Sequence, residues 1–128
     1  MDFIVFASLP ASDLDRARSW YEAKLGLTPE SESQEGTLIY MQSESSGFMV
    51  YASEFAGTNQ ATSAGLAVAD VEATVAELRA RGVIFEEYDM GEDFRTVDGI
   101  VTSADGRKAA WFKDSEGNIL GLGEDPRT

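Results

Sequence analysis

Two segments of the chain have apolar residues at the spacing of a helix that packs one face against a sheet. The first extends from a capping residue at Ser12 to Gly26, and the second from a capping residue at Asp70 to Gly82. Their apolar stripes consist of Leu14, Ala17, Tyr21 and Leu25 in the first segment and of Val71, Val75 and Leu78 in the second. Each pattern predicts one amphipathic helix that ends at a glycine.

Short apolar or alternating runs between turn-forming residues predict the strands. One run precedes each helix, at residues 3–8 and 65–68. Three runs follow the first helix, at 31–34, 37–41 and 48–53, and three follow the second, at 83–88, 108–113 and 119–122. Residues 90–106 are rich in Gly, Asp, Glu and Arg, so we expect a long loop there.

The two halves of the chain repeat one order of elements. An offset of 57 positions places Asp13-Leu14-Asp15 on Asp70-Val71-Glu72, at the starts of the two helices. One such unit is too small to cover its own sheet, so the two units are expected to pack together. The sequence therefore predicts a single domain over residues 1–128, with module one at about 1–54, a linker at 55–62 and module two at about 63–128.

Composition narrows the class of function. The formal charge of −13 repels phosphate backbones and anionic lipid surfaces, so we expect no nucleic-acid partner and no membrane partner. The apolar runs are also too short for a bilayer span. The chain has no cysteine and lacks the basic start of a secretory signal, so the predicted location is the cytoplasm. It has no histidine, which removes the commonest general base and a common transition-metal ligand.

Three motifs in order resemble the vicinal oxygen chelate superfamily, which contains glyoxalases, bleomycin resistance proteins and extradiol dioxygenases. Two are the module openings, at residues 9–27 and 66–83. The third, Asp114-Ser115-Glu116-Gly117-Asn118, is similar to the family's Asp-Pro-Asp-Gly-Asn turn, with Ser115 in place of the proline. The resemblance covers nearly the whole chain. It implies an α+β fold in which two β-α-β-β-β modules form a cupped mixed sheet, and it implies a homodimer.

The resemblance also implies four metal-ligand positions, and none of them carries a carboxylate or an imidazole here. Counting back from the two helix starts places the first-strand positions at Phe6 and Ser63. The position in the last strand is Gly121, and Tyr51 is the best match for the remaining one, with Met49 as the alternative if the register is shifted. These residues are poor ligands for a divalent metal, so we expect no metal and no other cofactor.

Aromatic residues at or near these positions are typical of a ligand pocket. The predicted pocket consists of Phe6, Tyr40, Tyr51, Ser63, Phe94, Arg95, Trp111, Phe112 and Gly121. Strand alternation places the neighbours Trp111 and Phe112 on opposite faces of their sheet, so only one of them can face a ligand. The leading hypothesis is a metal-free small-molecule binding protein, similar to the drug-sequestering bleomycin resistance proteins, whose ligand is cationic or aromatic.

An enzyme is the alternative hypothesis. It would use acid–base groups other than histidine, such as Tyr51, Glu92, Arg95 or Asp98, in a lyase-, isomerase- or dioxygenase-like reaction on an unknown substrate. A second form of this hypothesis places Mg²⁺ or Ca²⁺ on oxygen ligands from Glu86, Glu87 or Glu124. Catalytic residues stay unassigned because the sequence shows no nucleophile–base pair. A third reading is an interaction module with a vestigial pocket.

Overall fold

Each half of the chain forms one four-stranded mixed sheet with one helical segment, in a computed structural model that describes residues 1–125. Module one contains β1 (Ala7–Ala11), α1 (Leu14–Trp20), the π-helical turn η1 (Tyr21–Leu25), β2 (Ser31–Glu32), β3 (Leu38–Ser43) and β4 (Ser46–Ala52). Module two contains β5 (Thr62–Val68), α2 (Val71–Ala80), β6 (Ile100–Thr102), β7 (Lys108–Lys113) and β8 (Ile119–Glu124). The predicted α+β class with two β-α-β-β-β modules is confirmed.

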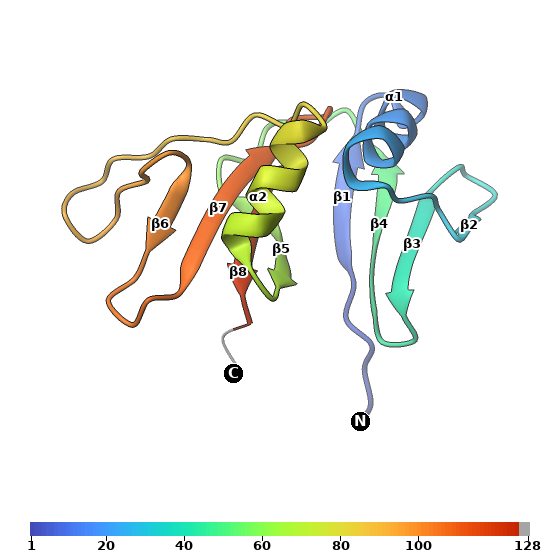
Figure 1. The fold of residues 1–128 in the computed structure, drawn as a ribbon. Coiled ribbons are helices and arrows are strands. Elements are labelled where there is room, and N and C mark those ends of the chain that lie inside the picture. The colour runs from blue at the N-terminus through green and yellow to red at the C-terminus, as the bar shows by residue number, and fades with distance from the viewer. Residues whose placement is uncertain (126–128) are drawn as a thin grey trace.

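The two sheets have the same topology. Their strand orders are β1-β4-β3-β2 and β5-β8-β7-β6. In each sheet the first strand is parallel to the last, and the other pairs are antiparallel. Figure 1 shows the sheets next to each other, with β1 and β5 nearest the centre of the molecule. Within residues 1–125, no helix is long and apolar enough to cross a membrane.

Side-chain caps explain where the two helices begin. Asp13 Oδ1 accepts a hydrogen bond from Arg16 N at 3.0 Å, and Asp70 Oδ1 accepts one from Ala73 N at 3.0 Å. The predicted cap at Asp70 is confirmed. The first helix is capped by Asp13 and not by Ser12, because the backbone and hydroxyl of Ser12 are hydrogen-bonded to a carboxylate of module two.

Both helical segments end at a glycine in the left-handed conformation, with φ of 67° at Gly26 and 90° at Gly82. The two ends also contact each other. Lys24 Nζ donates to Arg81 O at 2.9 Å, and Arg81 Nη1 donates to Lys24 O at a long 3.5 Å. Lys24 and Arg81 are 57 positions apart, which is the offset of the internal repeat. Each side chain therefore binds the backbone carbonyl of the other residue, at the end of the other module's helical segment.

The first strand begins four residues later than predicted, at Ala7 and not at residue 3. It pairs in parallel with β4, starting with Ala7 opposite Phe48. Since β4 begins only at Ser46, the same register leaves residues 1–4 without a strand beside them, and the observed pairing starts at Ala7. The apolar side chains of residues 3–5 are consequently 60–81% exposed.

The strand predicted at residues 83–88 is replaced by an irregular segment, and β6 lies inside the predicted loop 90–106. β6 pairs with β7 from Ile100 opposite Ala110 to Thr102 opposite Lys108. Phe85 makes an isolated bridge to Phe112 further along the same edge of β7. Residues 83–88 therefore reach only the end of this edge, because β6 occupies the rest of it.

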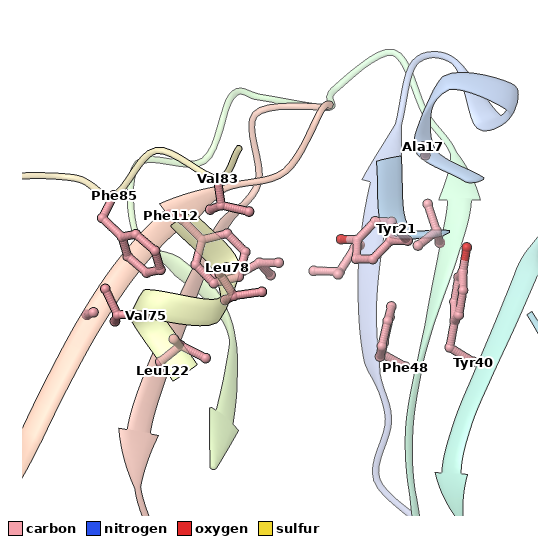
Figure 2. Close-up of a cluster of buried hydrophobic side chains, with 14 of the residues drawn as sticks. Ala17, Tyr21, Tyr40, Phe48, Val75, Leu78, Val83, Phe85, Phe112 and Leu122 are labelled. Carbon is pink, nitrogen blue, oxygen red and sulfur yellow. The ribbon is translucent and has the colours of Figure 1, made fainter. Parts of the chain in front are cut away.

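The helix-covered faces of the two sheets share one hydrophobic core (Figure 2). Trp20 of α1 stacks on Phe112 of β7 with 6.1 Å between ring centroids, so the helix of module one contacts the sheet of module two. The largest fully buried side chains are Leu9, Tyr21, Leu38, Tyr40, Val50, Val71, Val75, Phe112 and Leu120. They come from both modules, which accounts for the packing of one against the other.

The turn between β7 and β8 connects module two to the start of α1. The buried Glu116 carboxylate accepts hydrogen bonds from Ser12 N and Asp13 N, both at 3.0 Å, and forms an ion pair with Arg16 Nε at 2.8 Å. Burial opposes ionisation of Glu116, but hydrogen bonds from Arg16, Ser115 and Asp13 outweigh it and lower its pKa to about 2. We call this set of contacts the Glu116 latch.

Further hydrogen bonds connect the same turn to module one. The Tyr21 phenol donates to Asp114 Oδ2 at 2.6 Å inside the core, and Asn118 Nδ2 donates to Pro10 O at 2.9 Å. Burial, together with the Asp114 carboxylate, raises the pKa of Tyr21 far above its usual value. The motif that resembles the family's turn thus has a structural role in this chain.

Candidate ligand-binding site

Each sheet has one face covered by the helices and a second face, the open face, that α1 and α2 do not cover. Strand alternation assigns the residues of each face. The open face of module one carries Ser8, Pro10, Ile39, Met41, Met49 and Tyr51, and that of module two carries Gly65, Ala67, Ala109, Trp111, Gly121 and Gly123. Because the covered faces meet in one core, both open faces lie on the outside of the chain.

The open face of module two contains a cavity of about 350 Å³. Its floor is the backbone of β5 and β8, where the register places Gly65 beside Gly121 and Ala67 beside Gly123. A Cβ atom added at Gly65 or Gly123 would meet no atom within 4 Å, whereas one added at Gly121 would lie 3.1 Å from Trp111 Nε1. The floor is therefore open, and the Trp111 indole lies across Gly121.

Two further rings hold Trp111 in place and form an aromatic cluster with it. The Trp111 ring lies 5.4 Å from Phe94 and 5.8 Å from Tyr88, measured between centroids. The buried Thr96 fixes this part of the loop, since it donates its N–H to Tyr88 O at 2.8 Å and accepts from Tyr88 N at 2.8 Å. Burial and the neighbouring Glu86 carboxylate raise the pKa of Tyr88.

Three of the predicted pocket residues come together at this cavity. Trp111 and Gly121 line it, and Phe94 packs against Trp111 from the loop that precedes β6. Trp111 and Gly121 are direct neighbours across β7 and β8. The combination of one large aromatic side chain and an adjacent glycine leaves room for a ligand beside the indole.

Tyr40 and Phe112 do not belong to a pocket, which corrects the sequence interpretation. They are 1% and 0% exposed in the core, on the helix-covered faces. Phe112 contacts Phe85 with 5.5 Å between ring centroids, and Tyr40 stacks on Phe48 at 4.8 Å. Aromatic content alone could not distinguish these residues from Trp111, because the face on which each one lies depends on register.

The other four predicted residues do not line the cavity of module two. Phe6 and Tyr51 belong to module one and are 39% and 37% exposed. Ser63 lies on β5 just before the floor, where its hydroxyl is hydrogen-bonded to a linker residue. Arg95 forms an ion pair with Asp89 at 3.1 Å. A single chain therefore brings together only part of the predicted set.

The four positions that the fold implies for a metal provide no suitable ligand set. The register places Ser8 opposite Met49 and Gly65 opposite Gly121, and Ser8 and Gly65 are 57 positions apart. Met49, and not Tyr51, is therefore the counterpart of Gly121. Within residues 1–125, no group of three or more His, Cys, Asp or Glu side chains is arranged to hold a metal. A thioether, a hydroxyl, a phenyl ring and a glycine do not fit a divalent ion.

The carboxylates considered as an alternative metal site have other partners. Glu86 lies 3.5 Å from Lys113 Nζ. Glu124 accepts hydrogen bonds from Val71 N at 3.2 Å and from Lys108 N at 3.1 Å, one on each carboxylate oxygen. With Glu87 they form no cluster of ligands among the described residues. Their positions favour a structural role.

Three larger grooves lie on the described part of the chain; the one of about 600 Å³ adjoins the cavity at Ala67 and Glu124, and the other two lie elsewhere. One, of about 580 Å³, runs between the modules on the helix side and is lined by Leu9, Tyr21, Phe48, Leu66, Leu78, Leu122 and neighbouring residues. The other, of about 560 Å³, lies beside α2 and contains Arg79 and Arg95. Asp98 and Asp89 already pair with these two arginines. Neither groove combines an open floor with a supported aromatic ring.

A comparison with models of known protein families identifies the family of this chain. The profile of the Glyoxalase/Bleomycin resistance protein/Dioxygenase superfamily matches residues 3–122. The chain therefore belongs to this superfamily. A search of curated proteins gave no match.

Solved structures show how widely the fold is shared. A glyoxalase/bleomycin resistance protein from Catenulispora acidiphila is 24% identical, with a TM-score of 0.71 over 98% of this chain and 100% of that one. A bleomycin-binding protein in complex with bleomycin is 19% identical, with a TM-score of 0.70 over 98% and 99%. A lactoylglutathione lyase from Agrobacterium tumefaciens is 15% identical, with a TM-score of 0.70 over 98% and 95%. These similarities concern the fold.

Among the residues of the cavity and its wall that the sequence did not predict, three shape the site. Gly65 and Gly123 form the floor with Gly121, and Tyr88 completes the aromatic cluster. The spacing Gly121-Leu122-Gly123 was a usable signal, because two glycines separated by one residue in a strand expose the backbone on one face. Tyr88 gave no such signal, since it contacts Trp111 only through the irregular path of residues 83–99.

Proposed function

We propose that this protein binds a small organic molecule, without a metal, on the open face of module two. The cavity of about 350 Å³ carries the proposal, because it combines an unobstructed backbone floor with an aromatic cluster that holds Trp111. The residues at the four implied metal positions support binding without a metal. The bleomycin-binding protein shows that this fold can hold a small molecule.

The charge of the chain supports a cationic or neutral ligand. A net charge of −13 raises the local concentration of cations and disfavours anions. An aromatic ligand fits the aromatic cluster. The lack of cysteine is compatible with a reducing compartment, and we propose the cytoplasm as the location.

We further propose that the functional unit is a homodimer of single-domain chains. In one chain the cavity of module two is covered on one side only, since the two open faces do not face each other. Ile39, Met49 and Tyr51 give module one an apolar open face that could cover the cavity of a second copy. The exposed apolar residues 3–5 also favour association. The core shared by both modules supports a single domain.

Native mass spectrometry on protein purified without added metal or chelator tests these proposals together. We expect a dimer, no stoichiometric metal, and an organic adduct either after purification or after addition of aromatic cations. A compound that forms an adduct should also raise the melting temperature. A stoichiometric divalent ion would overturn the metal-free proposal and favour an enzyme with oxygen ligands. A monomer at all concentrations would overturn the homodimer.

A further inference from the structure

We infer that the floor of the module two cavity is a slot for one planar heteroaromatic ring that carries a hydrogen-bond acceptor and no negative charge. The slot has Gly65 and Gly123 as its open floor, and Trp111, which lies across Gly121, as its wall. This inference rests on the proposed binding function and names its ligand class. Three observations support it independently: the flat backbone floor, the N–H of the Trp111 indole, which is unpaired among the described residues, and the negative charge near the cavity.

The requirement for a flat ligand follows from the floor. On the open face, Gly65 and Gly123 present hydrogen atoms in place of side chains, and a Cβ at either position would meet nothing within 4 Å. The two strands β5 and β8 therefore offer a smooth strip of backbone. A planar ring can lie on such a strip in contact over its whole face, whereas a puckered ring touches it at fewer atoms.

The requirement for an acceptor follows from the Trp111 indole. Its Nε1 lies over Gly121, 3.1 Å from the position that a Cβ would occupy. Among residues 1–125, no group accepts a hydrogen bond from this N–H. Phe94 and Tyr88 pack against the same ring, so the donor is already oriented before a ligand binds. A carbonyl oxygen or ring nitrogen at the edge of the ligand would accept this hydrogen bond.

The preference against negative charge follows from Glu124. It is the only charged residue among the described residues that line the cavity. Its carboxylate lies on the helix-covered side of β8, where its two oxygens accept hydrogen bonds from Val71 N and Lys108 N, so it places a fixed negative charge behind the floor at the end of β8. Together with the charge of the whole chain, it disfavours an anionic ligand.

The indole N–H signals of ¹⁵N-labelled protein test the slot directly. The chain has two tryptophans, so Trp20→Phe identifies the Trp111 signal. We would titrate quinolin-2-one, which is flat and carries a carbonyl, and compare it with naphthalene, decahydroquinolin-2-one and quinoline-2-carboxylate. These compounds lack the acceptor, lack flatness and add a negative charge, respectively. We expect quinolin-2-one to shift the Trp111 signal and the other three to bind at least about tenfold more weakly.

Two matched variants separate the slot from general binding. Gly65→Val puts a side chain on the floor, where its Cβ would meet no atom within 4 Å, and should weaken quinolin-2-one binding by at least about tenfold. Ala52→Val adds comparable bulk at an exposed strand position outside both open faces and should leave binding unchanged. Unfolding curves of both variants report whether they are folded.

The outcomes distinguish this inference from the proposed function. An unmoved Trp111 signal, or equal binding of the saturated or acceptor-free compound, would overturn the slot. If the protein then still forms an organic adduct or is stabilised by another compound, the proposed binding function stands. If native mass spectrometry also shows no adduct with any compound, both are overturned. Equal weakening by Gly65→Val and Ala52→Val would likewise place the ligand outside the slot.

Discussion

The two open faces of this chain differ far more than the two modules that carry them. At equivalent positions, module one has Met49 and Tyr51 where module two has Gly121 and Gly123. The strand order, the aspartate caps and the glycine ends are nevertheless the same in both modules. The repeat therefore preserves what builds the fold, whereas the residues that can face a ligand differ. One face is covered with side chains, and the other exposes its backbone beside one tryptophan.

The largest expected effect is a loss of stability, and it differs between two neighbouring residues on opposite faces of β7. Phe112→Ala removes a fully buried ring from the core and should lower the free energy of unfolding by about 4 kcal/mol. Trp111→Ala removes the neighbouring ring on the open face and should cost about half as much or less, because Trp111 is only partly buried. It should abolish the binding of quinolin-2-one. Urea unfolding and ligand titration measure the two effects.

Equal losses of stability in these two variants would contradict the assignment of faces. A Trp111→Ala protein that still binds the ligand with unchanged affinity would contradict the role of the aromatic cluster. Trp111→Phe is the matched control, because it keeps an aromatic ring and removes the indole N–H. It should retain the stability of the chain and lose only part of the affinity.

A second comparison concerns the two turns that connect the last strands of each module. The turn between β7 and β8 contains the buried Glu116, whereas the turn between β3 and β4 contains the exposed Glu44. Glu116→Gln should lower the free energy of unfolding by about 3 kcal/mol, since it leaves Arg16 and the start of α1 without their carboxylate. Glu44→Gln should have no measurable effect. Chemical unfolding of both variants tests this difference, which a similar stability of the two proteins would contradict.

The Glu116 latch also predicts how stability depends on pH. The pKa of Glu116 is lowered from 4.5 to about 2 in the folded chain. A lowered pKa means that the stabilisation is present above the unfolded value and is lost as the pH falls through the folded value. The difference in unfolding free energy between the wild type and Glu116→Gln should therefore shrink as the pH falls from about 4.5 to 2. A difference that stays constant over this range would contradict the latch.

The sequence predicted those parts of the structure that depend on local chemistry. The cap at Asp70 and the stops at Gly26 and Gly82 need only a few neighbouring residues, and they were found correctly. The strand predicted at residues 83–88 was wrong and the loop predicted at 90–106 contains β6, because β6 and Phe85 compete for one edge of β7 and the outcome depends on distant pairing. Likewise, the sequence alone does not show which of Trp111 and Phe112 faces the core, because this depends on how β7 pairs with its neighbours.

The candidate site was predictable to a smaller extent than the fold. Gly121 was identified from its position after the closing motif and Trp111 as an aromatic residue on a predicted strand, but the floor requires β5 to lie beside β8 in one particular register. That pairing connects residues more than 50 positions apart, so no local pattern specifies it. Tyr40 was placed in the pocket for the same reason, since an aromatic residue in a strand is equally consistent with either face.

The smallest expected effect on stability comes from the reciprocal contact between the ends of the two helical segments. Lys24 and Arg81 each hydrogen-bond the carbonyl at the end of the other helical segment. Both hydrogen bonds are exposed, so Lys24→Ala and Arg81→Ala should each lower the free energy of unfolding by less than about 1 kcal/mol. A double-mutant cycle in urea should give a coupling that is positive but small, and high salt should weaken it. A coupling as large as the effect of Glu116→Gln would mean that this symmetric contact, and not the Glu116 latch between the β7–β8 turn and the start of α1, holds the modules together.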